Sequence, residues 1–293
     1  IEIYGINRKN ILKNFKTLKC FYNSIKKCKK IMKEFKPDVV IGVGGYVTGA
    51  VIYSAKKLGY PTFIHEQNSI PGRCNKFLSR YVDLIGISFE SSKELFKSGK
   101  VLYTGNPCSE EAIKKDAISK SKFGLSEHKK LVLIVMGSLG ASKVNEFFKN
   151  YIKLFNNKDY EVLYVTGNNS YESFSKIKVP SNVKVVPYIE DLTRIMKKAD
   201  IMVSRAGAST LSEIEALCVP SILIPSPYVP NNHQYKNAMD LVNKKCAIIV
   251  EEKDLKGDIL IRKIDELIKN DKELAEMKKN LNDSGIKNSA TFI

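Results

Sequence analysis

Short apolar runs alternate with stretches of helical spacing along most of the chain, and this alternation restricts the fold more than any other feature. Apolar runs of this length are typical of strands that are buried on both faces. Strands joined by helices form βαβ units, which build parallel sheets covered by helices. The sequence therefore predicts an α/β fold with strands at 37–43, 62–65, 82–88, 101–105, 131–136, 161–166, 183–188, 201–204, 221–225 and 247–250.

The 293 residues suffice for two domains of ordinary size. A polar stretch, residues 123–130, separates a helical stretch from the strong strand that begins at Leu131, and it has the character of a linker. We therefore expect one domain over residues 1–122 and a second over residues 123–293.

Composition excludes some classes of protein but does not identify a function. The formal net charge is +17, and segment 8–36 holds eleven Lys or Arg against one acid, Glu34. Such a basic surface suits nucleic acid, anionic lipid or an anionic substrate. No apolar run reaches the roughly 18 residues of a transmembrane helix. The six cysteines show no metal-ligand spacing, so we expect reduced thiols in a cytosolic protein and no metal site.

Three glycine-rich turns follow predicted strands, where ligands bind in open α/β sheets. The first, 42–49, contains Gly44 and Gly45 and precedes a helix that offers free N–H groups to an anion. It lacks the dinucleotide fingerprint, because Val47 stands where the last glycine is needed. The second turn, 137–140, contains Gly137, Ser138 and Gly140, and its hydroxyl and backbone N–H groups suit a diphosphate.

The third turn, 204–213, leads from a strand into a helix. Ser209 is expected to cap this helix, whose N-terminus carries about +0.5 charge and suits a phosphate. Glu213 follows four residues later on roughly the same helix face, where its carboxylate can accept hydrogen bonds from a ribose. The alternative is a capping box between Thr210 and Glu213.

Seven motifs carry a resemblance to one family. They occupy residues 36–49, 65–68, 105–107, 137–141, 188–191, 204–213 and 234–238, and both their order and their spacing agree. The chain resembles the MurG family, the bacterial enzymes that transfer N-acetylglucosamine (GlcNAc) from UDP-GlcNAc to lipid I. The resemblance extends from about residue 5 to about residue 250.

The resemblance implies the GT-B fold, in which two doubly wound parallel-sheet domains face a cleft, here with an incomplete N-terminal domain. It implies that UDP-GlcNAc binds the C-terminal domain, and lipid I the N-terminal one. Ile189 would hold uracil through its backbone, Glu213 the ribose and Gln234 the sugar hydroxyls, and Asn68 would line the N-terminal side of the cleft near the transferred sugar. The diphosphate would meet Ser138 and the helix start at Ala208, Ser209, Thr210, Leu211 and Ser212.

The implied reaction is an inverting hexosyl transfer to the 4-hydroxyl of the muramic acid unit, which yields lipid II for peptidoglycan synthesis and hence for cell-wall growth, shape and division. No Asp-x-Asp motif for a divalent metal is present, so helix and backbone N–H groups are expected to stabilise the leaving UDP without metal or cofactor. Two alternatives stay open, a UDP-sugar-binding fragment without catalysis and a UDP-GlcNAc 2-epimerase of the same fold.

The chain departs from the family at several points. The family's first glycine-rich loop, with the histidine that is the favoured general base, would precede residue 1, so we expect this chain to be inactive or nearly so, with His65 or Glu66 as substitute bases. Cys108 and Ser109 stand where an arginine is usual, which predicts weaker UDP binding or a substitute lysine. Met136 replaces a glycine.

Because lipid I is membrane-bound, the resemblance implies a peripheral protein at the cytoplasmic face of the membrane. Segment 10–35 has an apolar helical stripe with lysines around it, which suits an anionic lipid surface. The alternative is that the stripe packs on the sheet, and Ile31, Met32 and Phe35 are expected to face the core. No RNA-reading motif is present, so nucleic acid is not an expected partner. The stripe consists of Phe15, Leu18, Tyr22 and Ile25.

Overall fold

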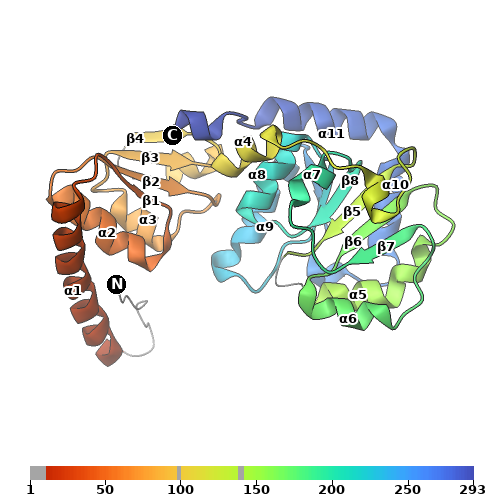
Figure 1. Ribbon diagram of the computed structural model, residues 1–293, viewed down its shortest axis with the longest axis horizontal. Coiled ribbons are helices and arrows are strands. Elements are labelled where there is room, and N and C mark those ends of the chain that lie inside the picture. The colour runs from red at the N-terminus through yellow and green to blue at the C-terminus, as the bar shows by residue number, and fades with distance from the viewer. Residues whose placement is uncertain (1–10, 98–99, 138–141) are drawn as a thin grey trace. The chain divides into compact units, whose positions relative to one another are not determined.

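The computed structural model describes residues 11–97, 100–137 and 142–293 (Figure 1). The chain forms two compact units, residues 1–105 with Ile293 and residues 106–292. Helix α4 (Pro107–Lys114) packs against α8 (Ala208–Leu217) and belongs to the second unit. The division therefore lies before α4, whereas the linker expected at residues 123–130 falls inside the second unit.

The first unit contains one parallel sheet with strand order β1-β2-β3-β4. Consecutive strands are joined by helical crossovers, which is the βαβ pattern that the sequence predicts. Central strand β2 is buried along its whole length, and its side chains contribute to the core of this unit. The elements are α1 (Ile11–Phe35), β1 (Val40–Gly42), α2 (Gly45–Lys57), β2 (Thr62–Glu66), α3 (Arg73–Leu78), β3 (Leu84–Ile87), η1 (Glu90–Leu95) and β4 (Lys100–Tyr103).

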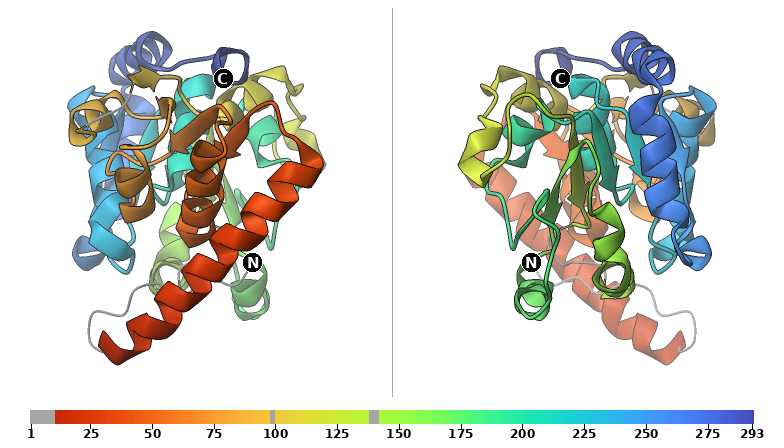
Figure 2. Two further views of the ribbon diagram at one scale, coloured as in Figure 1. Left: turned by 90° about the vertical axis from the view of Figure 1, so that its left-hand side faces the viewer. Right: turned by 90° about the vertical axis from the view of Figure 1, so that its right-hand side faces the viewer.

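Helix α1 is longer than the surface against which it packs. Its second half packs on α2, while its first turns extend beyond the rest of the first unit (Figure 2). Cys28 and Met32 are buried in the core, and Phe21 and Ile25 pack against it. The expected core positions were therefore wrong for Ile31 and Phe35, which are 47% and 78% exposed, because the buried side follows the i, i+4, i+7, i+11 positions from Phe21 instead.

The second unit contains a six-stranded parallel sheet with order β10-β9-β8-β5-β6-β7. The chain runs outward from β5 in one direction to β7, and then returns to β8 and continues in the other direction, so the switch point lies between β5 and β8. The strands are β5 (Leu131–Val135), β6 (Glu161–Val165), β7 (Val183–Val186), β8 (Ile201–Ser204), β9 (Ser221–Leu223) and β10 (Ala247–Ile249).

Helices bury both faces of this second sheet. One core cluster joins strand side chains to Phe148 of α5 and Leu260 of α10, while Leu211 and Ile214 of α8 are fully buried elsewhere. The predicted strands of both units are all present and all parallel, and their ends lie within three residues of the predicted ends. The remaining elements are η2 (Lys120–Phe123), α5 (Ser142–Tyr151), η3 (Ile152–Phe155), α6 (Asn168–Ser175), α7 (Leu192–Met196), η4 (Pro230–Asn232), α9 (His233–Asn243), η5 (Glu252–Asp254), α10 (Ile259–Lys269), α11 (Asp271–Ser284) and α12 (Ser289–Phe292).

Candidate functional site

A cavity of about 1010 Å³ lies at the switch point of the second sheet. Val135 and Gly137 line it from the end of β5, and Ser204, Arg205 and Gly207 line it from the end of β8. In doubly wound folds the crevice at such a switch point is where nucleotides bind. The volume is at the upper end of the range for small-molecule sites, so it suits a ligand the size of a nucleotide sugar.

Helix α8 begins at Ala208, and Gly207 is its N-cap, with φ −70° and ψ 141°. Extended backbone at Gly207 starts the helix earlier than expected, so Ser209 and Thr210 both lie inside its first turn. The prediction that Ser209 caps the helix is therefore wrong, as is the alternative capping box from Thr210 to Glu213. The first N–H groups of α8 receive no side-chain cap from Gly207, which leaves them beside the cavity for an anion.

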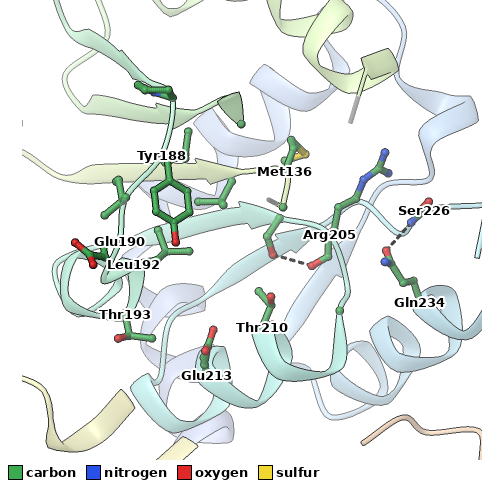
Figure 3. Close-up of a pocket in the computed structure, with 18 of the residues that line it drawn as sticks. Met136, Tyr188, Glu190, Leu192, Thr193, Arg205, Thr210, Glu213, Ser226 and Gln234 are labelled. Atoms are coloured by element: carbon green, nitrogen blue, oxygen red, sulfur yellow. Dashed lines mark hydrogen bonds between the residues drawn. The ribbon is translucent and has the colours of Figure 1, made fainter. Parts of the chain in front are cut away.

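Thr210 and Glu213 project from one face of α8 into the cavity, as Figure 3 shows. Their i, i+3 spacing places them one above the other along the helix. Among the described residues Glu213 makes no hydrogen bond or ion pair, and burial raises the pKa of its carboxyl to about 7, which the charge of Lys115 partly opposes. A desolvated carboxylate without a protein partner is characteristic of a binding site rather than of a structural ion pair.

A second wall of the cavity is braced by Glu252. The Arg205 guanidinium donates to Glu252 Oε2 at 2.6 Å and to the Ile224 carbonyl at 3.0 Å, and the Tyr228 hydroxyl donates to Glu252 Oε1 at 3.0 Å. The side chains of Arg205 and Glu252 are 12% and 6% exposed. One buried carboxylate thus joins the turn before α8 to the loop that follows β9.

Gln234 belongs to α9 and lies at the end of the cavity where Arg205 lies (Figure 3). Its Oε1 accepts a hydrogen bond from the Ser226 amide at 2.8 Å. This bond orients the side-chain amide, so the Nε2 group remains as the donor that the cavity can use.

The loop that carries Ile189 is fastened to the segment after α4. Lys115 Nζ pairs with Asp191 Oδ1 at 2.7 Å, Arg194 Nε donates to the Asp116 carbonyl at 2.9 Å, and Lys197 Nζ donates to the Ile113 carbonyl at 2.8 Å. These bonds fix the loop in place. Among the described residues no backbone hydrogen bond uses the amide or the carbonyl of Ile189, so both remain for a ligand.

The residues that replace the usual arginine make other contacts. Ser109 is buried and donates to the Ser212 carbonyl at 3.1 Å, and the Cys108 thiol lies 3.7 Å from the Ser209 carbonyl. Burial and the charge of Glu213 raise the pKa of Cys108 to about 12, so the thiol stays neutral. Lys115 lines the cavity but its Nζ is paired with Asp191, so the substitute lysine stays a prediction.

The structure brings only part of the predicted substrate-binding set to the cavity. Ile189, Thr210, Glu213 and Gln234 line it, together with Gly137 and Met136. Leu211 is fully buried in the core and the Ser212 hydroxyl donates to the Ala208 carbonyl, because their positions on α8 face away from the cavity. Ala208 and Ser209 contribute the first turn of α8 but do not line the cavity, and Ser138 and Gly140 lie outside the described residues.

Several lining residues were missed. Arg205 lies directly after the end of β8 at the switch point, and that position is a signal that sequence reasoning offers. Lys143 lies farther from its strand, as the second residue of α5, and gives no such signal. Tyr228, Glu252 and Lys115 give no comparable signal, because each reaches the cavity from an element distant in sequence.

His65 and Glu66 of the first unit are held by a local hydrogen-bond network. His65 is buried, its Nε2 lies 2.8 Å from the Gly105 carbonyl and its Nδ1 3.2 Å from Gln67 Nε2, and burial lowers the pKa of its ring. Glu66 is also buried and accepts hydrogen bonds from the amides of Asn68 and Gly72 and from the Asn68 and Asn75 side chains. These contacts favour structural roles for both residues.

The other site residues that the sequence predicts in this unit, Asn68, Gly44 and Gly45, lie near this network. The Asn68 side chain donates to Glu66 Oε1 at 3.3 Å. Gly44 and Gly45 have φ of 96° and 81°, a backbone region that favours glycine, and they form the N-terminus of α2. Gly44 provides no side-chain cap there.

Two parallel α/β units, one of which has a nucleotide-sized cavity at its switch point and a helix N-terminus that no described side chain caps, are characteristic of GT-B glycosyltransferases. The chain belongs to glycosyltransferase family 28. Residues 1–87 match the family's N-terminal domain and residues 131–291 match its C-terminal domain.

Relatives and solved structures agree with this assignment. A Bacillus cytotoxicus protein named UDP-N-acetylglucosamine--N-acetylmuramyl-(pentapeptide) pyrophosphoryl-undecaprenol N-acetylglucosamine transferase is 46% identical over 99% of this chain and 81% of its own length. The crystal structure of Acinetobacter baumannii MurG matches with a TM-score of 0.77 and 26% identity, over 99% of this chain and 82% of that one. A Neisseria meningitidis UDP-GlcNAc 2-epimerase, with a TM-score of 0.65 and 17% identity over 98% and 81% of the two chains, shares the fold alone.

Proposed function

We propose that this protein transfers GlcNAc from UDP-GlcNAc to lipid I, the reaction of the MurG family. The 4-hydroxyl of the muramic acid sugar attacks the anomeric carbon, the bond to the UDP oxygen breaks, and a β-1,4 bond forms with inversion. The hydroxyl proton passes to a general base, and UDP leaves as the anion. The observation that carries this proposal is the pairing of Glu213 with the uncapped start of α8 in one cavity.

We assign the parts of the nucleotide sugar to successive residues along the cavity. Uracil is assigned to the backbone of Ile189, ribose to Glu213, the diphosphate to Thr210 and the first turn of α8, and the GlcNAc hydroxyls to Gln234. The N-terminus of α8 stabilises the charge that develops on the leaving diphosphate, which preorganised N–H groups do without reorganisation. No step of this assignment requires a metal ion or a cofactor.

The acceptor is assigned to the first unit. Lipid I carries a diphosphate, and the N-terminus of α2, with its glycines at positive φ, offers free N–H groups to it. Asn68 lies in the same unit and is assigned to the acceptor side. His65 and Glu66 are not assigned as the base, because their polar atoms already have partners.

We assign the exposed side of α1 to the membrane surface at the cytoplasmic face. Phe15, Leu18 and Tyr22 are 68%, 61% and 58% exposed, and lysines that include Lys19 and Lys26 are exposed around them, whereas Ile25 packs on the core. An apolar stripe with basic flanks suits an interfacial helix on anionic lipid. Among the described residues no helix is long and apolar enough to cross a bilayer.

Serine at Phe15, Leu18 and Tyr22 together should weaken binding to vesicles of phosphatidylglycerol and phosphatidylcholine by about tenfold or more, because the apolar contact with the acyl boundary is lost. Sedimentation with the vesicles measures this. Serine at Leu154 and Tyr171, exposed apolar residues of the second unit, is the matched control and should change nothing. Binding that survives the triple substitution would leave α1 without a membrane role.

A transfer assay tests the proposed reaction. Titration calorimetry should detect UDP binding, and release of UDP with formation of lipid II from UDP-GlcNAc and lipid I would support the proposed reaction and overturn the expectation that this chain is inactive. UDP binding with conversion of UDP-GlcNAc into its C2 epimer would instead identify an epimerase. Absence of UDP binding would refute the proposal.

A further inference from the structure

Among the residues that the structure describes, three cationic side chains line the cavity, Lys115, Lys143 and Arg205. Lys115 pairs with Asp191 at 2.7 Å, and Arg205 pairs with Glu252 at 2.6 Å. Each of these pairs is close to neutral as a unit. The diphosphate of a nucleotide sugar carries two negative charges, so the charge available to it depends on the third cation.

Lys143 has no carboxylate within ion-pair distance among the described residues. Its Nζ lies 5.4 Å from the centroid of the Tyr228 ring, a cation–π distance. The Tyr228 hydroxyl in turn donates to Glu252. The resting partner of Lys143 is therefore the phenol of Tyr228, an exposed loop residue, whose hydroxyl as a hydrogen-bond partner raises the pKa of the lysine, with a smaller contribution from the charge of Glu252.

The position of Lys143 in the fold places it at the same edge of the sheet as the start of α8. Lys143 is the second residue of α5, the helix that follows β5, and α8 follows β8. Because β5 and β8 are neighbours in a parallel sheet, both helices begin at the same edge, on either side of the switch point. Lys143 and Thr210 line one cavity from these two helices.

We propose that Lys143 binds the diphosphate of the nucleotide sugar and supplies its cationic contact. This inference rests on the proposed function. Lys143 exchanges the Tyr228 ring for a phosphate oxygen when the ligand enters, while the braced Arg205 and Lys115 keep the walls in place. The contact strengthens as negative charge grows on the leaving group, so it serves both binding and transfer.

The test compares ligands that contain or lack phosphate. With Lys143→Met, affinity for UDP should fall on the order of tenfold, as expected for loss of a charge-assisted contact, while affinity for uridine stays unchanged. Calorimetry measures UDP directly, and uridine by competition. Lys143→Arg should retain UDP affinity within about threefold. Lys149→Met removes the same charge from the last turn of α5, away from the cavity, and should have no effect.

Two results would overturn the inference. UDP affinity that is unchanged in Lys143→Met excludes a phosphate contact, and an equal loss for UDP and uridine means that the residue only maintains the shape of the cavity. If Lys143→Met does not fold, the affinities for UDP and uridine are measured for Lys143→Gln instead, and they decide between the same outcomes. Failure of the unsubstituted protein to bind either ligand would refute the proposed function itself, which is a different outcome from the failure of Lys143 alone.

Discussion

Glu213→Ala should lower the affinity for UDP-GlcNAc by about a hundredfold. An ionised carboxylate that accepts hydrogen bonds from two ribose hydroxyls makes two charge-assisted contacts, and their loss is worth about 3 kcal/mol. Because Glu213 has no protein partner among the described residues, its removal should not lower the thermal stability of the protein. Titration calorimetry and a thermal scan of the same sample measure both quantities.

The pH dependence gives a second signature of this residue. The pKa of Glu213 is raised to about 7 by burial, so the ionised form that binds ribose becomes dominant as pH rises from 6 to 8. Affinity for UDP-GlcNAc, whose diphosphate does not titrate in this range, should therefore increase by up to about tenfold over that interval. UDP-GlcNAc should bind weakly to Glu213→Gln, and its affinity should not depend on pH.

The raised pKa of Glu213 also determines whether the stability of the ligand-free protein rises or falls with pH. The folded-state pKa of Glu213 lies above 4.5, the ordinary value for a glutamate, so the folded protein retains a proton that the unfolded chain has lost. The stabilisation is complete below pH 4.5 and is lost as pH rises through about 7.

Glu146→Ala, on the exposed side of α5, serves as the control for all three measurements. Normal UDP-GlcNAc affinity in Glu213→Ala would remove the central contact of the proposed site.

Glu252→Ala should destabilise the second unit by about 3 kcal/mol, because it leaves the Arg205 guanidinium buried without its partner. For a domain of this size the corresponding drop in melting temperature is roughly 6–12 °C. Differential scanning calorimetry suits this measurement because it can resolve the transitions of two domains. The loss of the Tyr228 contact adds to the effect.

The neighbouring residue provides a matched control. Glu251 pairs with Lys253 at 3.1 Å, but both side chains are exposed, so Glu251→Ala should change stability by less than about 0.5 kcal/mol. Replacing the buried pair as a whole, with Arg205→Met and Glu252→Leu, should recover much of the lost stability, since no unpaired charge remains. A double substitution as unstable as Glu252→Ala would mean that the ion pair is not the source of the effect.

The strands were predictable because their signal is local. A run such as 131–136 is apolar throughout, and the structure buries every residue of β5. Periodicity also places Thr210 and Glu213 on one helix without any knowledge of the fold. The helix start was less predictable, since the dihedral angles of Gly207 decide whether Ser209 is a cap or lies in the first turn. Similarly, α1 has several apolar positions, and its neighbour α2 determines which of them are buried.

By itself the sequence determined the α/β class, the parallel strands, the three glycine-rich turns and the family, since all of these depend on spacing along the chain. Only the tertiary structure decided which charged side chains of the cavity form ion pairs. Arg205 and Glu252 are 47 residues apart, and Lys115 and Asp191 are 76 apart. Ion pairs between distant elements form only when the sheet brings those elements together, so no local pattern could single out Lys143 as the cavity lysine that pairs with no carboxylate among the described residues.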